Sequence, residues 1–291
     1  MRGLSLHGVR VLNLSINLPG PAAAARLHAM GADVVKVEPP GGDPLSRFVP
    51  EWYQDLCEGQ FVISLDLKSA SGESSLNEYL SKSDLLITAS RLAALQRLGL
   101  DWVTLHNRYP DLCHVAILGS PAPKEHQPGH DLTYQAELGL IDPPQLPRTL
   151  LADLAGAERA VSAGIALLLA HARGRDASYQ EVFLAEAAEF FTHPLRYGVT
   201  SHGGFLGGGL ARYNLYPTKT GWIAVGALEQ HFWNRLMHEL GLESHNPGWE
   251  DLERVFRKET ALFWEDWARA RDLPIVAVKG IDGKVEVGDQ I

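Results

Sequence analysis

Short apolar segments that alternate with helix-forming segments are the feature that most restricts how this chain can fold. Residues 9–14 are apolar and contain β-branched side chains, and residues 34–38 have the same character. Between them, residues 22–30 are typical of a helix that ends at Gly31. A strand, a helix and a second strand in this order predict the start of a parallel α/β layer.

The alternation continues as far as residue 118. Further strands are predicted at 61–65, 85–87 and 113–118, with helices at 74–82 and 91–98 and a helical turn that Asp101 caps. Five strands separated by helices predict a Rossmann-like, open and mostly parallel sheet.

The second half of the chain is more mixed. The predicted elements are a long helix at 155–171, a strand at 179–184, a helix at 185–191, a strand at 222–227, helices at 230–240 and 250–270, and a strand at 273–278. We therefore expect a large α/β domain over residues 1–197, a smaller α+β domain over 198–278 and a C-terminal tail over 279–291.

Composition excludes several function classes. The formal net charge is -9 and no basic run occurs, so a nucleic-acid partner is not expected. No apolar stretch approaches the roughly 20 residues that cross a bilayer, and the first residues lack the apolar core of a signal peptide. Two cysteines make neither a disulfide framework nor a metal cluster. These features predict a soluble, cytoplasmic protein without a membrane partner.

Common cofactor and nucleophile motifs are missing. The turn after the first predicted strand, residues 15–21, reads Ser-Ile-Asn-Leu-Pro-Gly-Pro and not Gly-x-Gly-x-x-Gly, so a nicotinamide dinucleotide site is not expected. Neither a phosphate-binding Gly-x-x-x-x-Gly-Lys loop nor a Gly-x-Ser-x-Gly elbow occurs. None of the twelve histidines forms a His-x-x-x-His pair on a predicted helix with a carboxylate beside it, so no metal is expected.

Two proton-carrying residues, His130 and Asp153, lie at the two ends of the segment from Gly129 to Gly156. Asp153 directly precedes the predicted long helix. It is either a helix cap that accepts hydrogen bonds from exposed N–H groups, or a proton-transfer group beside N–H groups that face a developing negative charge. The residues themselves leave both interpretations open.

Eight segments, taken in order, resemble the family III CoA-transferases (CaiB/BaiF-like), and within them the α-methylacyl-CoA racemase branch. These segments are residues 6–12, Pro19-Gly20-Pro21, residues 31–38 with 40–44, residues 65–69, Arg97-Leu98-Gly99-Leu100, Pro128-Gly129-His130-Asp131, residues 152–156 and residues 225–232.

The resemblance implies a fold, an activity and a set of site residues. The fold is a large Rossmann-like domain with a smaller domain, in a homodimer of interlocked rings. The family's transferases form acyl intermediates on an Asp at the position of Asp153, and its racemases pair that Asp with a His, here His130, and a Glu, here Glu229. All three are present, which favours an acyl-CoA racemase.

The implied chemistry is two-base proton transfer at the α-carbon of a 2-methylacyl-CoA, through an enolate. His130 and Asp153 flank the carbon, N–H groups around Asp153 stabilise the charged oxygen, and Glu229 orients His130. By the same resemblance, Ile16, Asn17 and Leu18 contact the adenosine or pantetheine part of CoA and Arg91 pairs with its phosphates. CoA is then the carrier part of the substrate, and no prosthetic group is implied.

Two other functions stay open. One is an acyl-CoA:carboxylate CoA-transferase with Asp153 as nucleophile, and the other is a non-catalytic family member. Basic residues common in the family are missing, since Pro39 stands where an Arg is common and residues 56–60 replace an Asn-Arg-Gly-Lys-like segment. An acyl group on a protein carrier, in place of free CoA, is therefore an alternative substrate.

Overall fold

The computed structural model describes residues 4–243 and 247–285. The chain forms two compact units, Met1–Thr192 and His193–Ile291. The division that the sequence predicts, after residue 197, lies a few residues further along the chain.

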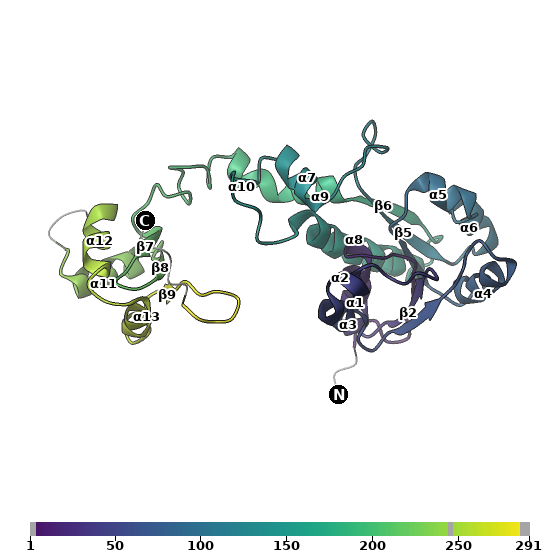
Figure 1. The fold of residues 1–291 in the computed structure, drawn as a ribbon, viewed down its shortest axis with the longest axis horizontal. Helices are drawn as coiled ribbons and strands as arrows, with labels where there is room; N and C mark the ends of the chain where they lie inside the picture. Colours follow the sequence, from purple (N-terminus) through teal and green to yellow (C-terminus); the bar gives the residue numbers. More distant parts are fainter. Residues whose placement is uncertain (1–3, 244–246, 286–291) are drawn as a thin grey trace. The chain divides into compact units, whose positions relative to one another are not determined.

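The first unit is built on a six-stranded sheet in which every strand pairing is parallel. Its strands are β1 (Arg10–Asn13), β2 (Asp33–Glu38), β3 (Phe61–Ser64), β4 (Leu85–Thr88), β5 (Cys113–Leu118) and β6 (Tyr179–Phe183). They lie in the order β3-β2-β1-β4-β5-β6. Figure 1 labels β2, β5 and β6 of this sheet. The predicted Rossmann-like sheet is confirmed, and its strand order reverses direction between β1 and β4.

Helices connect these strands. They are α1 (Pro19–Ala29), α2 (Leu45–Phe48), α3 (Pro50–Cys57), α4 (Ala70–Leu80), α5 (Leu92–Arg97), α6 (Trp102–Arg108), α7 (Asp131–Glu137), α8 (Leu151–Ala172) and α9 (Leu184–Glu189), followed by the 3₁₀ turn η1 (Phe190–Thr192). The short helices α2, α3 and α7 are absent from the sequence prediction, because segments of four to eight residues show little helical periodicity.

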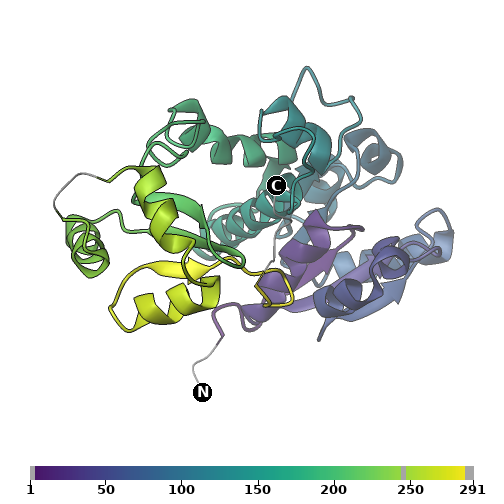
Figure 2. The same ribbon diagram turned by 60° about the vertical axis from the view of Figure 1, so that its left-hand side comes forward.

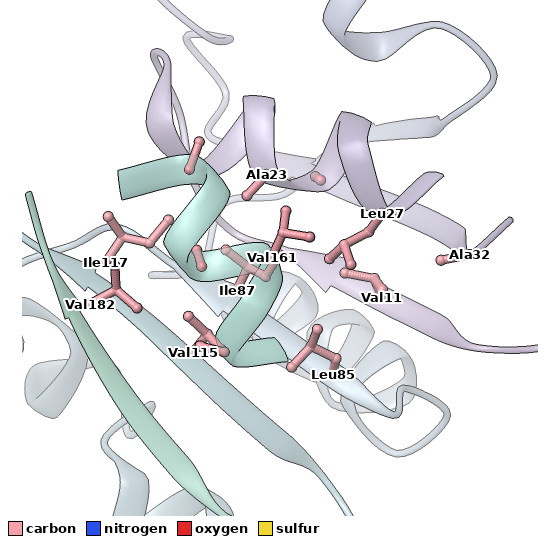
Figure 3. Close-up of a cluster of buried hydrophobic side chains, with 14 of the residues drawn as sticks. Val11, Ala23, Leu27, Ala32, Leu85, Ile87, Val115, Ile117, Val161 and Val182 are labelled. Atoms are coloured by element: carbon pink, nitrogen blue, oxygen red, sulfur yellow. The ribbon is translucent and has the colours of Figure 1, made fainter. Parts of the chain in front are cut away.

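Each face of the sheet carries its own core. On one face, α1 and α8 pack on side chains that include Val11, Ile87 and Val115. Alanines such as Ala23 and Ala160 let the two helices approach each other closely (Figure 3). On the other face, α4, α5 and α6 bury a separate cluster that contains Leu12 and Leu86. Neighbouring strand residues such as Val11 and Leu12 point to opposite faces. Because both faces are covered by helices, both carry apolar side chains.

Helix α8 is longer than predicted, because it begins at Leu151 and not at residue 155. By length and composition alone, its 22 residues are apolar enough to cross a membrane, which the sequence analysis does not anticipate. In the structure, Ala157, Ala160 and Val161 of this helix are buried against the sheet and α1. This packing is typical of the core helix of an α/β unit.

The second unit is an α+β layer. The strands β7 (Tyr213–Pro217), β8 (Trp222–Gly226) and β9 (Ile275–Ala277) form an antiparallel sheet. The helices are α10 (His193–Arg196), α11 (Gln230–Leu240), α12 (Trp249–Phe256) and α13 (Ala261–Arg269); Figure 2 shows this part in green and yellow. The single helical region predicted at 250–270 is two helices, because Thr260 accepts a hydrogen bond from the N–H of Phe263 and starts a new one.

Candidate active site

The two predicted proton-transfer residues lie at the starts of two helices that follow β5. His130 is the N-cap residue of α7. Its N–H donates to Thr133 Oγ1 at 3.0 Å, and the same hydroxyl donates back to the His130 carbonyl at 2.8 Å. The short α7 therefore begins at a fixed residue, with the exposed side chain of His130 at its tip.

Asp153 lies inside the first turn of α8 and is not its cap. The cap is Asp131, the first residue of α7, whose Oδ1 accepts the N–H of Ala152 at 2.7 Å and that of Asp153 at 3.2 Å. The residue in the N-cap position itself, Leu150, has no side chain that can do this. The cap interpretation of Asp153 is therefore wrong, and its carboxylate is left free for another role.

The second oxygen of Asp131 is held as firmly as the first. Gln135 Nε2 donates to Asp131 Oδ2 at 2.6 Å and to the carbonyl of Thr149 at 3.2 Å. Both Asp131 and Gln135 are buried. One amide group thus ties α7 to the residues just before α8, and these bonds determine how the helix start that carries His130 lies against the one that carries Asp153.

Asp153 has the electrostatic properties of a proton-transfer group. The pKa of its carboxyl is raised from 3.8 to about 6. Burial is the largest cause, the negative charge of Asp131 also raises the pKa, and His130 lowers it. The opposite effects of Asp131 and His130 place both within electrostatic range of Asp153. Within the described residues, nothing donates a hydrogen bond to the Asp153 carboxylate, so no bond stabilises its charged form.

The N–H groups around Asp153 do not match the sequence expectation. Those of Ala152 and Asp153 are bonded to Asp131 and cannot also bind a charged substrate oxygen. In the part of the chain that the structure describes, the N–H groups of Asp131 and Leu132, at the start of α7, have no acceptor. The unbonded donors nearest to His130 in sequence therefore belong to α7.

Tyr134, which the sequence analysis does not identify, packs beside this pair. A Cβ atom at Gly119 would come within 2.4 Å of the Tyr134 hydroxyl, and one at Gly129 within 2.5 Å. Burial raises the pKa of the Tyr134 hydroxyl, and the charge of Asp153 raises it further. The two glycines explain why this phenol fits here. The Gly119 position, directly after β5, is the only sequence signal for it.

The predicted CoA contacts come from two loops at the carboxyl edge of the sheet. Residues 16–18 follow β1, and Arg91 follows β4 as the N-cap residue of α5. Strands β1 and β4 are neighbours, and the N–H of Leu14 donates to the carbonyl of Ile87 at 2.9 Å. The sheet thus brings the two loops together at its topological switch point, where open α/β sheets bind ligands. Asn17 and Arg91 are exposed there, whereas Leu18 is buried.

Glu229 belongs to the second unit. It is the N-cap residue of α11, with an exposed side chain that makes no capping hydrogen bond. Its predicted pairing with His130 stays a prediction.

Among the described residues, no group of three or more His, Cys, Asp or Glu side chains is placed to hold a metal ion. The cysteines Cys57 and Cys113 are not joined by a disulfide.

Sequence comparisons identify the family of the chain. Residues 6–283 match the family described as CoA-transferase family III. The alpha-methylacyl-CoA racemase of Mus musculus is 28% identical over 288 residues, covering 89% of this chain and 74% of that protein. The cinnamoyl-CoA:phenyllactate CoA-transferase of Clostridium sporogenes is 35% identical over 139 residues, covering 43% of this chain and 34% of the transferase.

Solved structures share the fold. A hypothetical protein of Mycobacterium tuberculosis has a TM-score of 0.85 at 22% identity, covering 96% of this chain and 87% of that one. A CAIB/BAIF family protein of Brucella suis has a TM-score of 0.81 at 19% identity, covering 97% and 86%. Since the family match spans residues 6–283, the chain belongs to CoA-transferase family III, a family of enzymes that act on acyl-CoA thioesters.

Proposed function

We propose that the chain is an acyl-CoA racemase that inverts the α-carbon of a 2-methylacyl-CoA by two-base proton transfer. One observation carries the proposal: an exposed imidazole, His130, and a carboxyl whose pKa is raised to about 6, Asp153, lie at the starts of two helices tied together by Asp131. The similarity to the mouse racemase over most of the chain supports it.

The reaction needs one group to take the α-proton and another to return a proton to the opposite face. In one direction the Asp153 carboxylate removes the proton, the C–H electron pair moves onto the thioester to form an enolate, and the protonated imidazole of His130 donates to the other face. In the reverse direction the neutral imidazole is the base and the carboxylic acid of Asp153 is the donor. A carboxyl with a pKa of about 6 exists in both forms near neutral pH, which suits these alternating roles.

The enolate places negative charge on the thioester oxygen. We assign its stabilisation to the N–H groups of Asp131 and Leu132, because those of Ala152 and Asp153 are already bonded to the Asp131 carboxylate. Removing one such donor typically costs 10²–10³-fold in rate in other enzymes, so this part of the site matters as much as the bases.

We place the CoA part of the substrate at the switch point between β1 and β4. Residues 16–18 contact its adenosine or pantetheine, and Arg91 pairs with its phosphates through the planar guanidinium. The chain works as a homodimer. The bases, the donors and the loops of the first unit account for the acyl and CoA ends of one substrate.

A CoA-transferase is the second candidate, with the Asp153 carboxylate as nucleophile. The observation in its favour is that this carboxylate accepts no hydrogen bond within the described residues, and the similarity to the Clostridium transferase adds to it. In that reaction, Asp153 attacks the thioester carbonyl, the C–S bond breaks, and CoA leaves as the thiolate.

Deuterium exchange separates the two candidates. A 2-methylacyl-CoA incubated with the protein in deuterated water is expected to gain deuterium at the α-carbon while it racemises. A transferase would instead leave the α-proton in place and form a hydroxylamine-sensitive acyl adduct on Asp153. Binding of CoA without exchange or adduct, across several acyl chain lengths, would support a non-catalytic protein and end both proposals.

A further inference from the structure

A cluster of buried charged residues lies behind the proposed CoA-binding loop. Lys36 and Glu38 come from β2, and Asp43 from the turn that follows it. Lys36 is 0% exposed and so is Asp43, although such side chains are almost never fully buried unless they are paired. These residues lie in one of the segments that resemble the family, residues 31–38 with 40–44. The proposed reaction does not use their charged side chains.

The ammonium group of Lys36 has three polar neighbours for its three hydrogens. It donates to Asp43 Oδ2 at 2.6 Å and to Cys57 Sγ at 3.7 Å, and it forms an ion pair with Glu38 Oε1 at 2.8 Å. It also lies 4.6 Å from the centre of the Tyr53 ring. Burial lowers the pKa of Lys36, but the bonds to Asp43 and Glu38 outweigh burial, so its pKa lies above the ordinary value. The lysine is therefore charged and fixed.

The two carboxylates are fixed in turn. Glu38 accepts the Tyr53 hydroxyl on Oε1 at 2.8 Å and the Asp43 N–H on Oε2 at 3.1 Å. Asp43 uses its remaining oxygen, Oδ1, to accept the N–H of Asn17 at 3.0 Å and that of Leu45 at 2.9 Å. The cluster thus reaches out of the sheet's edge to one residue of the CoA-binding loop, Asn17.

Asn17 is the residue that needs such support. Its φ is +66°, in the left-handed region that residues other than glycine adopt only in a few per cent of cases, although asparagine does so more often than most. Its own side chain is exposed, and no hydrogen bond from that side chain holds the conformation in the part of the chain that the structure describes. The bond from its N–H to Asp43 therefore fixes the backbone of the loop.

We propose that the buried Lys36–Asp43 ion pair is a positioning device that presets residues 16–18 for the CoA end of the substrate. Lys36 fixes the Asp43 carboxylate, and Asp43 holds Asn17 in its left-handed conformation. The loop is then shaped before CoA arrives, so little conformational freedom is lost on binding. This inference rests on the proposed function, because it is that function that assigns the loop to CoA.

The test compares two substitutions in the same cluster. Asp43→Asn removes the negative charge that pairs with Lys36, on the residue that accepts the N–H of Asn17. Tyr53→Phe removes only the hydrogen bond to Glu38. Calorimetry with CoA, and KM and kcat with a 2-methylacyl-CoA, are measured for both variants after their folding is checked by circular dichroism. We expect Asp43→Asn to weaken CoA binding and raise KM about tenfold with a small change in kcat, and Tyr53→Phe to leave both affinities within about twofold.

A second pair of variants avoids the buried charges, in case Asp43→Asn does not fold. Asn17→Val opposes a positive φ, and Asn17→Gly allows it. The valine variant is expected to bind CoA several-fold more weakly than the glycine variant.

The positioning role is overturned if Asp43→Asn binds CoA as the wild type does, if Tyr53→Phe loses as much affinity as Asp43→Asn, or if the two Asn17 variants bind equally. If the variants differ in CoA binding as expected but the wild type does not racemise its substrate, the proposed function alone is overturned. A wild type that racemises with no differences among the variants would overturn the inference alone.

Discussion

Replacing Asp153 by Asn is expected to stabilise the fold at neutral pH, although it removes a proposed catalytic group. The pKa of the Asp153 carboxyl is raised from 3.8 to about 6 by burial, with a smaller contribution from the charge of Asp131. A raised pKa means that the folded chain binds this proton more tightly than the unfolded chain does. Above pH 6 the folded state therefore bears the cost of a poorly solvated charge, about 3 kcal/mol at 1.36 kcal/mol per unit.

The stabilisation should follow the pH. Asparagine carries no charge at any pH, so the variant is expected to exceed the wild type by about 2–3 kcal/mol in the free energy of unfolding at pH 7–8. The difference should shrink as the pH falls through 6 and be small at pH 4, where Asp153 is protonated in the folded state. It should vanish only well below pH 3.8, where Asp153 is protonated in the unfolded state as well. In thermal unfolding the gain at pH 7 corresponds to about 2–4 °C for each kcal/mol.

Urea unfolding at five pH values between 4 and 8, followed by circular dichroism, measures this difference. Asp101→Asn is the matched control, because Asp101 also lies at a helix start but bonds to Thr104 lower its pKa. A carboxyl whose pKa is lowered by folding stabilises the fold at any pH above its pKa in the unfolded chain. This control is therefore expected to be less stable than the wild type at pH 7. The reasoning would be refuted if Asp153→Asn were less stable than the wild type at pH 7. It would also be refuted if the difference in the free energy of unfolding between the two proteins did not change with pH.

The remaining predictions concern the neighbours of Asp153. Asp131→Asn keeps an oxygen for the N–H groups of α8 but removes a like charge, so the pKa of the Asp153 carboxyl should fall, as carbon-13 NMR titration would show. An unchanged or higher pKa would contradict this electrostatic role of Asp131. Gly119→Ala should destabilise the chain by about 1–3 kcal/mol, because the added Cβ would meet the Tyr134 hydroxyl. In a double-mutant cycle, adding Tyr134→Phe should restore part of the lost stability. A double variant no more stable than Gly119→Ala alone would argue against this contact.

The sheet can be predicted from the sequence because local patterns determine its strands. The β-branched run that forms β5 and the amphipathic run that forms α11 match their predicted bounds, since periodicity and the glycine after α11 are local signals. The start of α8 was predicted at residue 155, because its cap, Asp131, lies about twenty residues earlier and only the fold brings it to Leu151.

The site was predictable in part for the same reason. The resemblance to a family identifies His130 and Asp153, but the sequence does not show that Asp131 occupies the N–H groups of Ala152 and Asp153, because this contact is long-range. The burial of Lys36 within β2 and of Asp43 in the turn after it cannot be seen in the sequence, since charged side chains usually face water. Long-range polar contacts, and not propensity, account for these differences.

The central claim, that His130 and Asp153 act on opposite faces of one carbon, is tested most directly with separate enantiomers of a 2-methylacyl-CoA. Deuterium exchange at the α-carbon is measured for His130→Gln and Asp153→Asn with each enantiomer. Each variant is expected to lose racemisation but to keep exchange with a single enantiomer, and the two variants should keep opposite ones. Two variants that exchange the same enantiomer, or that exchange both as the wild type does, would contradict the two-base account.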